Sequence, residues 1–478
     1  MNKNIRLKSE LDDVLDWSAT QVLGAIKTRE VSVSEVVDVA LERAQQTQED
    51  CNCFTAIFAE ESREQARNID TALAQGGGHA AGALLGVPIG IKDFTPTQGQ
   101  LTTCGSVLMK DHVTTRDAVV AKRLKAAGGI VIGKTTTPEF AHSGMTSSPL
   151  WGATCNPWDS KRSSGGSSGG SGVAVTCKAV YLAEGSDMGG SIRIPASFCG
   201  CVGLKPSKGR IPMDALDSVF DHISHFGPLA RSVDDAALFL KITQGAYEPD
   251  IQSQRSPMPI SEVIQNDAKG LRLAVSPDLG IYNVDPEIIG NLRQSVSALE
   301  DAGAQVDWVD LNWPVHYIKH WEDYWGVFLA AQFGHHLEQH RDRMDPELVG
   351  LMEAGMKIDA VTMERGAIVR TEQWHKMAKL FETYDALICP TTAKVAPPVH
   401  ANESDFTTFD ENGGYNALDM TAIFNNVSVC PAIAVPNGFT KAGLPTSVQV
   451  VGHRFDDPMV LRLAKCLESR APWTNWQP

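Results

Sequence analysis

Hydrophobic residues recur along parts of the chain with the three-to-four-residue period of amphipathic helices. Segment 32–45, SVSEVVDVALERAQ, has this period, and Ser32 followed three positions later by Glu35 matches a helix-capping box. Segment 117–129, DAVVAKRLKAAGG, has the same period, with Asp117 as the predicted N-cap and two glycines as stop signals. Both segments are predicted helices.

Short apolar runs between the helical segments predict buried strands. One is 84–92, LLGVPIGIK, and another is 130–134, IVIGK, directly after the second predicted helix. Further runs, with one more helical pattern at 286–304 among them, occur at 179–187, 271–275, 384–392, 432–436 and 446–452. Strands that alternate with helices predict an α/β fold, a sheet covered by helices. No linker rich in proline or charge divides the chain, so we expect one domain over 1–478.

Composition excludes several classes of partner. The 478 residues carry a formal net charge of −15, which offers no basic surface to a nucleic acid. No apolar run approaches the roughly 20 residues that cross a membrane, and the start, MNKNIRLKSELDDV, lacks the apolar core of a signal peptide. The ten cysteines are scattered, as in reduced cytosolic proteins. We expect a cytoplasmic protein that binds neither nucleic acid nor membrane.

Pairs of cysteines and histidines raise the question of a metal site. The close pairs are Cys51/Cys53, Cys199/Cys201, His222/His225, His316/His320 and His336/His340. None is accompanied by the further ligands and the general base that a catalytic zinc site requires. We therefore expect no metal and no other cofactor.

The most unusual stretch is 163–172, SSGGSSGGSG, which contains only serine and glycine. This composition is typical of a flexible linker. The segments on both sides are patterned as core, however, and glycine inside a fold allows the backbone to approach another group closely. We therefore expect these serines to face a small common space in the interior.

A serine becomes a nucleophile only when a neighbouring base takes its proton. Lys92 ends an uncharged apolar run, and burial there would lower its pKa from about 10.4 by the roughly 3 units that leave it neutral near pH 7.5. The turn 189–191 can direct successive backbone amides at a developing negative charge. The G-x-S-x-G motif of α/β-hydrolases is absent around these serines. The residues thus allow a serine nucleophile whose base is a lysine.

Taken together, these segments resemble the amidase signature family. The resemblance covers nearly the whole chain, and its most specific part is GGSSGGSG at 165–172 followed by GSDMGGSIRIPASFCGCVGLKPS at 185–207. The other matching segments are GVPIGIKD at 86–93, FNNVSVCPAIAVPNG at 424–438 and GLPTSVQVVG at 443–452. The resemblance implies an amidase-signature fold, with a central mixed twisted sheet covered on both faces by helices.

The resemblance also implies a serine hydrolase of carboxamides that works through an acyl-enzyme. It implies Ser191 as the nucleophile, Lys92 as the base and Ser167, after a cis peptide bond from Gly166, as the bridge between them. It places oxyanion and substrate contacts at the backbone of Met188, Gly189 and Gly190, with the amide of Ser191. Supporting roles in orienting the loops fall to Ser168, Asp187 and Arg193.

Within the single domain we expect three parts: an N-terminal helical part at 1–75, a catalytic core at 80–210 and a helical segment at 310–380 that shapes the substrate pocket. In the last part Trp321 and Trp325 recur at helical spacing, which fits a buried helix face or the pocket wall for an aryl or alkyl acyl group. The candidate pocket residues are Met145, Trp321, Trp325, Arg370 and Asp419.

Three functions remain open at this point. The first is a stand-alone amidase, expected as a homodimer, that acts on a small carboxamide or a related anilide, hydrazide or ester. The second is the glutamine-hydrolysing A subunit of a tRNA-dependent amidotransferase, and the third is an inactive scaffold. Arg370 and Asp419 fall where that subunit holds glutamine, but Ile194 replaces its usual glutamine and DHISHFGP at 221–228 departs from its pattern. Intact serines and lysine disfavour a scaffold, so we favour the amidase.

Overall fold

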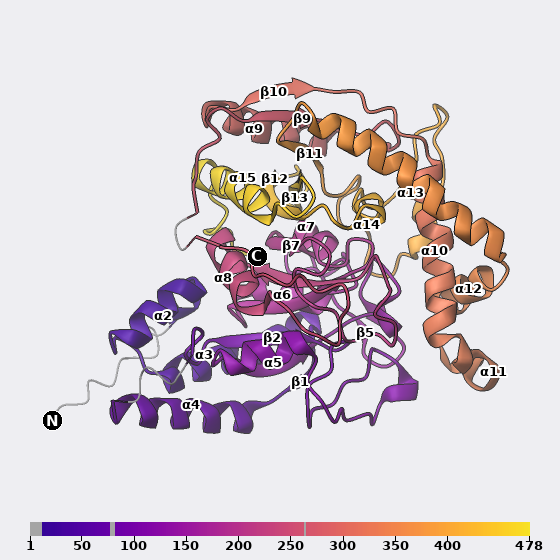
Figure 1. The fold of residues 1–478 in the computed structure, drawn as a ribbon. Helices are drawn as coiled ribbons and strands as arrows, with labels where there is room; N and C mark the ends of the chain where they lie inside the picture. The colour runs from indigo at the N-terminus through magenta and orange to yellow at the C-terminus, as the bar shows by residue number, and fades with distance from the viewer. Residues whose placement is uncertain (1–11, 77–81, 262–263) are drawn as a thin grey trace.

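The computed structural model describes residues 12–76, 82–261 and 264–478 and contains an eleven-stranded sheet (Figure 1). Its strands, in sheet order, are β1 (Phe54–Ile57), β3 (Ile130–Thr135), β2 (Pro88–Lys92), β6 (Leu182–Asp187), β8 (His225–Ala230), β7 (Val202–Lys205), β12 (Ala432–Phe439), β13 (Pro445–Gly452), β11 (Ala386–Pro390), β9 (Arg272–Val275) and β10 (Gln305–Trp308). A separate two-stranded sheet pairs β4 (Ser147–Ser148) with β5 (Gly152–Ala153). Residues 1–11 and 80–81, which belong to two of the expected parts, lie outside the described residues.

The large sheet is mixed. Strand β2 runs parallel to both β3 and β6, and β9 runs parallel to β10 and β11, whereas the other neighbours are antiparallel. Central strands such as β6 and β13 are buried along their whole length, as strands covered on both faces must be. The apolar runs of the sequence therefore form strands of this sheet, and those of β2, β3 and β6 are buried as predicted.

Helices cover both faces of this sheet. They are α2 (Ala19–Lys27), α3 (Val33–Cys51), α4 (Ala59–Ala74), α5 (Val119–Ala126), α6 (Gly169–Thr176), α7 (Arg193–Cys199), α8 (Val233–Thr243), α9 (Pro286–Asp301), α10 (His316–Phe333), α11 (Leu337–His340), α12 (Pro346–Gly355), α13 (Ala360–Phe381), α14 (Ile423–Asn426) and α15 (Asp457–Arg470). Helices α6 and α7 pack together against the central strands, and α8, α9 and α15 form a second packed group on the sheet. The α/β fold expected from the sequence is confirmed.

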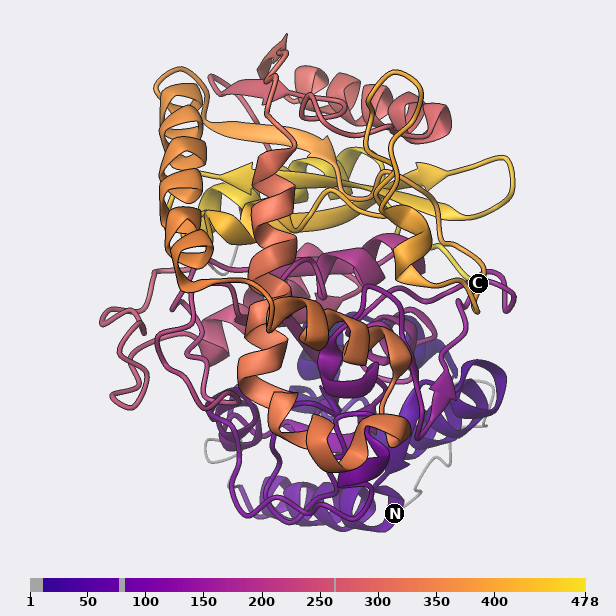
Figure 2. The same cartoon turned by 90° about the vertical axis from the view of Figure 1, so that its right-hand side faces the viewer.

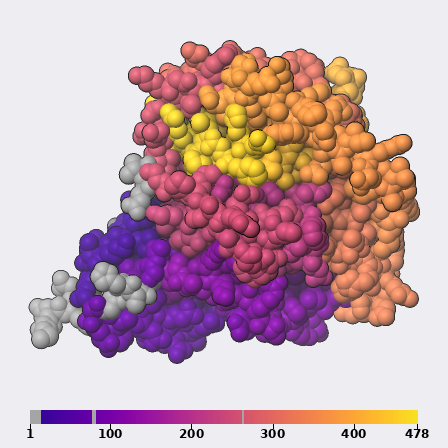
Figure 3. Space-filling model, in the orientation of Figure 1, coloured from indigo at the N-terminus to yellow at the C-terminus, as the bar shows by residue number. Residues whose placement is uncertain are grey.

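Helix α10 stands beside the sheet and packs against α12 and α13, as Figure 2 shows. These helices occupy most of the segment 310–380, which was expected to be helical. In the space-filling view the indigo-to-purple N-terminal residues form the lower part of the molecule, the yellow C-terminal residues lie in the upper part, and an orange segment extends down the right side (Figure 3). In the described part of the chain, none of the helices has both the length and the apolar composition of a membrane span.

Local signals placed one predicted helix start correctly and another one residue early. Helix α3 begins after Ser32, whose side chain accepts from the amide of Glu35 while the Glu35 carboxylate accepts from the amide of Ser32. Helix α5 begins after Ala118, so the expectation that Asp117 caps it is wrong. The Asp117 carboxylate instead accepts from the amide of Gln98 and pairs with Lys125. These partners lie outside the first turn of the helix, so the local pattern did not reveal them.

The capping box of α3 gives a test of local stability. Ser32→Ala should lower the free energy of unfolding by about 1 kcal/mol, because an amide at the helix start loses its acceptor. Chemical denaturation followed by tryptophan fluorescence measures the change. As a matched control, Ser469→Ala removes an exposed hydroxyl near the end of α15 that only donates back to the Lys465 carbonyl, and should change stability by less than about 0.5 kcal/mol. An equal loss in both variants would contradict a capping role.

Candidate active site

The candidate site residues lie at one edge of the sheet, the edge formed by the carboxyl ends of β2 and β6. Strands β2 and β6 are parallel neighbours, so Lys92 at the end of β2 and Asp187 at the end of β6 lie at the same edge. Helix α6 begins in the serine-glycine tract and α7 begins two residues after Ser191. Because α6 and α7 pack together, the tract and the turn that carries Ser191 meet beside Lys92.

Lys92 is fully buried, and its amine faces hydroxyl groups. Its Nζ lies 2.6 Å from Ser167 Oγ and 2.9 Å from Ser186 Oγ. Burial lowers the pKa of Lys92 from 10.5 to about 7, although the negative charges of Glu184 and Asp187 act to raise it. At neutral pH a large fraction of this amine is therefore free to accept a proton.

Two other buried lysines provide a contrast. Burial lowers the pKa of Lys134 to about 8 and that of Lys205 to about 7, against the attraction of Asp93 and Asp187 respectively. The amine of Lys205 donates to main-chain carbonyls, that of Cys430 at 2.8 Å among them, which can only accept. The amine of Lys134 donates to the Thr95 carbonyl and also contacts the hydroxyls of Thr97 and Thr102, both at 3.2 Å. A hydroxyl can both accept from an ammonium and donate to a neutral amine. The hydroxyl contacts of Lys92, at 2.6 and 2.9 Å, are shorter than those of Lys134 and suit it to proton exchange.

The serine-glycine tract is part of the interior, as the sequence predicted. The peptide bond Gly166–Ser167 is cis, and Ser167 is buried. A side chain at 166 would place its Cβ 2.7 Å from the amide nitrogen of Met145, so only glycine fits there. The tract is thereby pressed against the 143–145 backbone with Ser167 Oγ directed at Lys92.

Ser191 is less buried than the other two residues, which leaves it open to a reacting molecule. Its carbonyl accepts from the amide of Ser168 at 3.1 Å, and the Ser168 hydroxyl in turn contacts both the amide and the carbonyl of Ser186 at 3.3 Å. Ser168 thus connects the tract to the end of β6. Among the described residues no hydrogen bond joins the hydroxyls of Ser167 and Ser191 directly.

The turn 188–191 presents free backbone amides. In the described part of the chain, the amides of Met188, Gly189 and Ser191 donate to no protein acceptor. The amide of Gly190, which the sequence assigned to the same group, instead donates to Asp187 Oδ1 at 2.8 Å. The expectation that the Gly190 amide faces the oxyanion is therefore wrong, because the Asp187 carboxylate, at the end of β6, accepts from this amide. Three amides, rather than four, remain available to an oxyanion.

A fully buried ion pair supports this turn. Arg193 donates from Nε and Nη2 to the two carboxylate oxygens of Asp187, both at 3.0 Å, and Asn425 donates to Asp187 Oδ1 at 3.0 Å. Burial alone would raise the pKa of Asp187, but the charge and hydrogen bonds of Arg193 hold it well below its ordinary value. These contacts are compatible with the supporting roles expected of Asp187 and Arg193, which stay a prediction.

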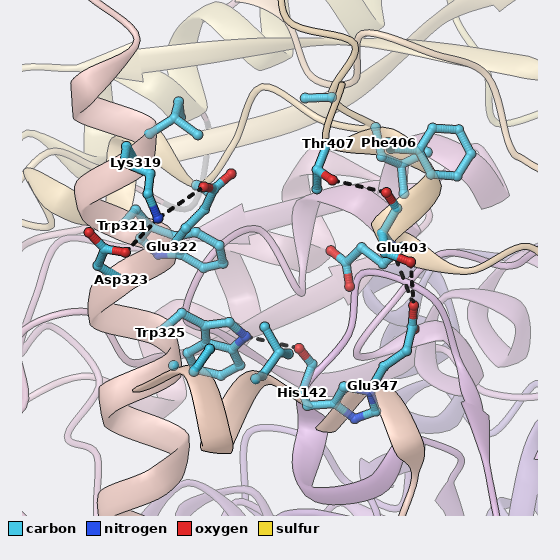
Figure 4. Close-up of a pocket in the computed structure, with 18 of the residues that line it drawn as sticks. His142, Lys319, Trp321, Glu322, Asp323, Trp325, Glu347, Glu403, Phe406 and Thr407 are labelled. Carbon is cyan, nitrogen blue, oxygen red and sulfur yellow. Dashed lines mark hydrogen bonds and ion pairs between the residues drawn. The ribbon is translucent and has the colours of Figure 1, made fainter. Parts of the chain in front are cut away.

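A cavity of about 570 Å³ opens beside the turn. Figure 4 shows Trp321 and Trp325 of α10 on one side, with Glu403, Phe406 and Thr407 across from them. Trp321 Nε1 donates to the Met188 carbonyl at 3.1 Å, so the cavity adjoins the free amides. Carboxylates of this lining are Glu322, Asp323, Glu347, Glu403 and Asp419, whereas its basic residues are Lys319 and His142.

Two of the five candidate pocket residues do not line this cavity. Met145 packs in an apolar cluster with Ile194 and Phe198. Arg370, on α13, donates from Nε to the Asn426 carbonyl at 2.9 Å. The charge of Arg370 acts on His320 and Tyr324, which lie on the face of α10 next to the one that carries Trp321 and Trp325. Arg370 therefore lies next to a different face of α10 from the face that lines the cavity, and its position in the sequence did not reveal this.

Several residues of the site were not identified from the sequence. Ser186 contacts the Lys92 amine, and Glu184 accepts from the Lys92 amide at 3.0 Å. Both lie on β6 two positions apart, so the period of a strand could have placed them on one face. Thr421, whose hydroxyl donates to the Gly189 carbonyl at 2.7 Å, comes from a distant segment without such a signal.

Of the paired histidines, His225 lies at this edge, with its Nδ1 3.2 Å from the Asp187 carbonyl, whereas three others contact other elements. His316 faces Glu372, His320 packs against Gly366, and His336 stacks on Phe140. All ten cysteines are free thiols. Across residues 12–76, 82–261 and 264–478, no three potential metal ligands of the His, Cys, Asp and Glu types come together.

Comparison with known proteins identifies relatives along nearly the whole chain. The family model described as Amidase matches residues 35–461. An acylamidase of Rhodococcus erythropolis is 34% identical over 97% of this chain and 98% of its own length, and the glutamyl-tRNA(Gln) amidotransferase A subunit of Geobacillus kaustophilus is 32% identical over 97% and 99%. The crystal structure of a bacterial aryl acylamidase of the amidase signature family superposes with a TM-score of 0.89, at 26% identity over 96% of this chain and 97% of that one.

The buried ion pair under the turn gives a test of the site's architecture. Arg193→Gln should lower the free energy of unfolding by about 3–5 kcal/mol, because Asp187 would remain buried without its counter-charge. Denaturation in urea measures the loss. The control is Arg63→Gln, which breaks an exposed pair with Asp38 and should cost less than about 1 kcal/mol. Similar losses in both variants would show that the Asp187–Arg193 pair contributes no special stability.

Proposed function

The chain belongs to the amidase signature family, and from this premise we propose that it is a stand-alone amidase in which Ser191 attacks the carbonyl of a small carboxamide while Ser167 and Lys92 move the protons. Hydrolysis of amides is the activity of the family, whereas the triad and the substrate are our proposal. We further propose that the chain acts as one domain. A homodimer and a cytoplasmic location stay predictions.

The contact between Lys92 and Ser167 carries the proposal. A buried amine with a pKa of about 7, placed 2.6 Å from a buried hydroxyl, is able to act as a general base near neutral pH. Ser191 is the accessible serine next to this pair and stands at the end of the turn with the free amides. These features together supply a base, a nucleophile and donors for an oxyanion.

In the proposed reaction, neutral Lys92 takes the proton of Ser167, and Ser167 takes the proton of Ser191 as the Ser191 oxygen bonds to the amide carbon. The carbonyl oxygen becomes an oxyanion, which the free amides of Met188, Gly189 and Ser191 are available to stabilise. The C–N bond then breaks, and the amine leaves with a proton from Ser167, which Lys92 replenishes. A water molecule loses a proton along the same path, attacks the acyl-enzyme and releases the acid, with the proton returned to Ser191.

The cavity favours some substrates over others. Its aromatic wall suits an aryl or alkyl group, and its five carboxylates disfavour a substrate that carries a negative charge. Glutamine carries such a charge on its α-carboxylate, and Arg370, its expected partner, is not among the lining residues. The name of the Rhodococcus relative, acylamidase, and that of the aryl acylamidase structure agree with this choice. We propose neutral or amine-bearing acylamides, anilides included, as the substrate class.

The amidotransferase subunit is the second candidate, favoured by the Geobacillus relative at 32% identity and by Asp419 in the cavity wall. A direct assay separates the two functions. The purified chain, without ATP or partner, should hydrolyse N-acylanilides and small aliphatic amides, and should hydrolyse glutamine at least about tenfold less efficiently in kcat/KM. Ser191→Ala should abolish turnover while Ser197→Ala, on the neighbouring helix, should retain it. Turnover of glutamine alone would contradict the proposal and favour the amidotransferase.

The lysine gives a pH test. Because the pKa of Lys92 in the folded protein lies near 7, below its ordinary value of 10.5, the neutral base is lost as pH falls. We expect kcat/KM to rise with pH through about 7 and to level off above it. Lys92→Ala should lower kcat/KM by about 10²–10⁴-fold and remove this rise.

Lys92→Arg serves as the charged control for that profile. A guanidinium stays protonated at any working pH, so this variant should be as inactive as Lys92→Ala. An active Lys92→Arg enzyme with an unchanged pH profile would show that another group is the base.

A further inference from the structure

The hydrogen bonds of the turn fix the direction of three successive peptide planes. In a trans peptide the carbonyl and the amide N–H of one plane point in opposite directions, and no peptide of this turn is cis. The Gly190 carbonyl accepts from the Ile194 amide at 2.7 Å, so the Ser191 N–H of that plane points away from α7. The plane between Gly189 and Gly190 is held at both ends, by Thr421 and by Asp187.

The third plane, between Met188 and Gly189, is held by a side chain from a distant helix. Trp321 Nε1 donates to the Met188 carbonyl at 3.1 Å, and the N–H of the same plane belongs to Gly189, which has no protein acceptor in the described part of the chain. The indole also covers Gly189, because a Cβ at that position would lie 2.2 Å from Trp321 Cζ2. Rotation of this plane would therefore break the hydrogen bond and drive the backbone into the ring.

We propose that Trp321 is a positioning residue for the oxyanion: its indole N–H holds the Met188 carbonyl so that the Gly189 amide faces the oxygen on which charge develops. The same indole lines the cavity, so one side chain connects the wall that binds the acyl group with the donors that stabilise its carbonyl. This inference rests on the proposed function, in which Ser191 is the nucleophile.

Trp325 provides a comparison for Trp321 within the same wall. It stacks on Trp321 with ring centroids 5.8 Å apart, lines the same cavity, and donates from Nε1 to a backbone carbonyl, that of His142, at 3.0 Å. The two tryptophans thus differ chiefly in which carbonyl they hold. Only the carbonyl held by Trp321 belongs to the plane that carries an amide of the turn. A loss specific to the Trp321 N–H is therefore a loss of positioning and not of the pocket wall.

The test compares Trp321→Phe with Trp325→Phe, each of which keeps a ring and removes the N–H. The probe is a serine-directed fluorophosphonate, whose phosphoryl oxygen needs the same donors, and the rate constant for labelling Ser191 is measured. Loss of an oxyanion donor costs about 10²–10³-fold, so Trp321→Phe should slow labelling at least about tenfold. Trp325→Phe, which alters the same wall, should slow labelling by a clearly smaller factor and should act mainly on the KM of an anilide substrate. With an anilide substrate, Trp321→Phe should lower kcat at nearly constant KM.

Trp321→His, a smaller ring that retains an N–H donor, should recover part of the labelling rate, and thermal melting of each variant checks that the fold is kept. Equal labelling by wild type and Trp321→Phe, with labelling lost in Lys92→Ala, would overturn the role of Trp321 and leave the proposed function intact. Equal losses in Trp321→Phe and Trp325→Phe would also overturn it, because the wall alone would explain them. Absence of labelling at Ser191 in the wild type would overturn the proposed function itself.

Discussion

The site depends on one buried contact, that between the Lys92 amine and the Ser167 hydroxyl. An amine removed from water favours its neutral form, and the fold maintains this burial because β2 lies between two parallel neighbours in the middle of one half of the sheet. The neutral amine then needs partners that can donate as well as accept, which Ser167 and Ser186 supply. Glycines in the serine-glycine tract follow from the same constraint, since a Cβ at 166 would keep the tract from closing on the lysine.

A second constraint acts on the turn that carries Ser191. Its free amides are useful only when their planes are held. The Asp187–Arg193 pair, which flanks the turn in sequence, and Thr421 and Trp321, from two distant parts of the chain, hold them. Arg193 also donates to the Thr421 carbonyl and to Gln449, so the C-terminal strands are tied to the same pair. The candidate site thus depends on contacts from across the sheet, although Lys92, Ser167 and Ser191 themselves lie in three short segments.

The cavity adds selectivity to this chemistry without adding a reactive group. One helix, α10, contributes the aromatic wall on one face, while its next face packs toward α13 and Arg370. The carboxylates across the cavity make its lining acidic. Burial raises the pKa of both Glu403 and Asp419, and repulsion from the negative charge of Asp419 raises that of Glu403 further. Under the proposed function, substrate choice and turnover share a residue, because Trp321 lines the cavity and also donates to the Met188 carbonyl of the turn.

The sequence by itself determined the elements whose causes are local. Period and capping located α3, apolar runs located the central strands, and the motif resemblance located the family, Lys92, Ser167 and Ser191. Tertiary structure alone decided contacts that no local period predicts: the amide of Gly190 donates to Asp187, Asp117 accepts from the amide of Gln98 instead of capping a helix, and Arg370 donates to the Asn426 carbonyl instead of lining the cavity. The physical reason is that helical and strand periods describe regular elements over a few residues, whereas hydrogen-bond partners in turns and the walls of pockets are fixed by how the elements pack in space.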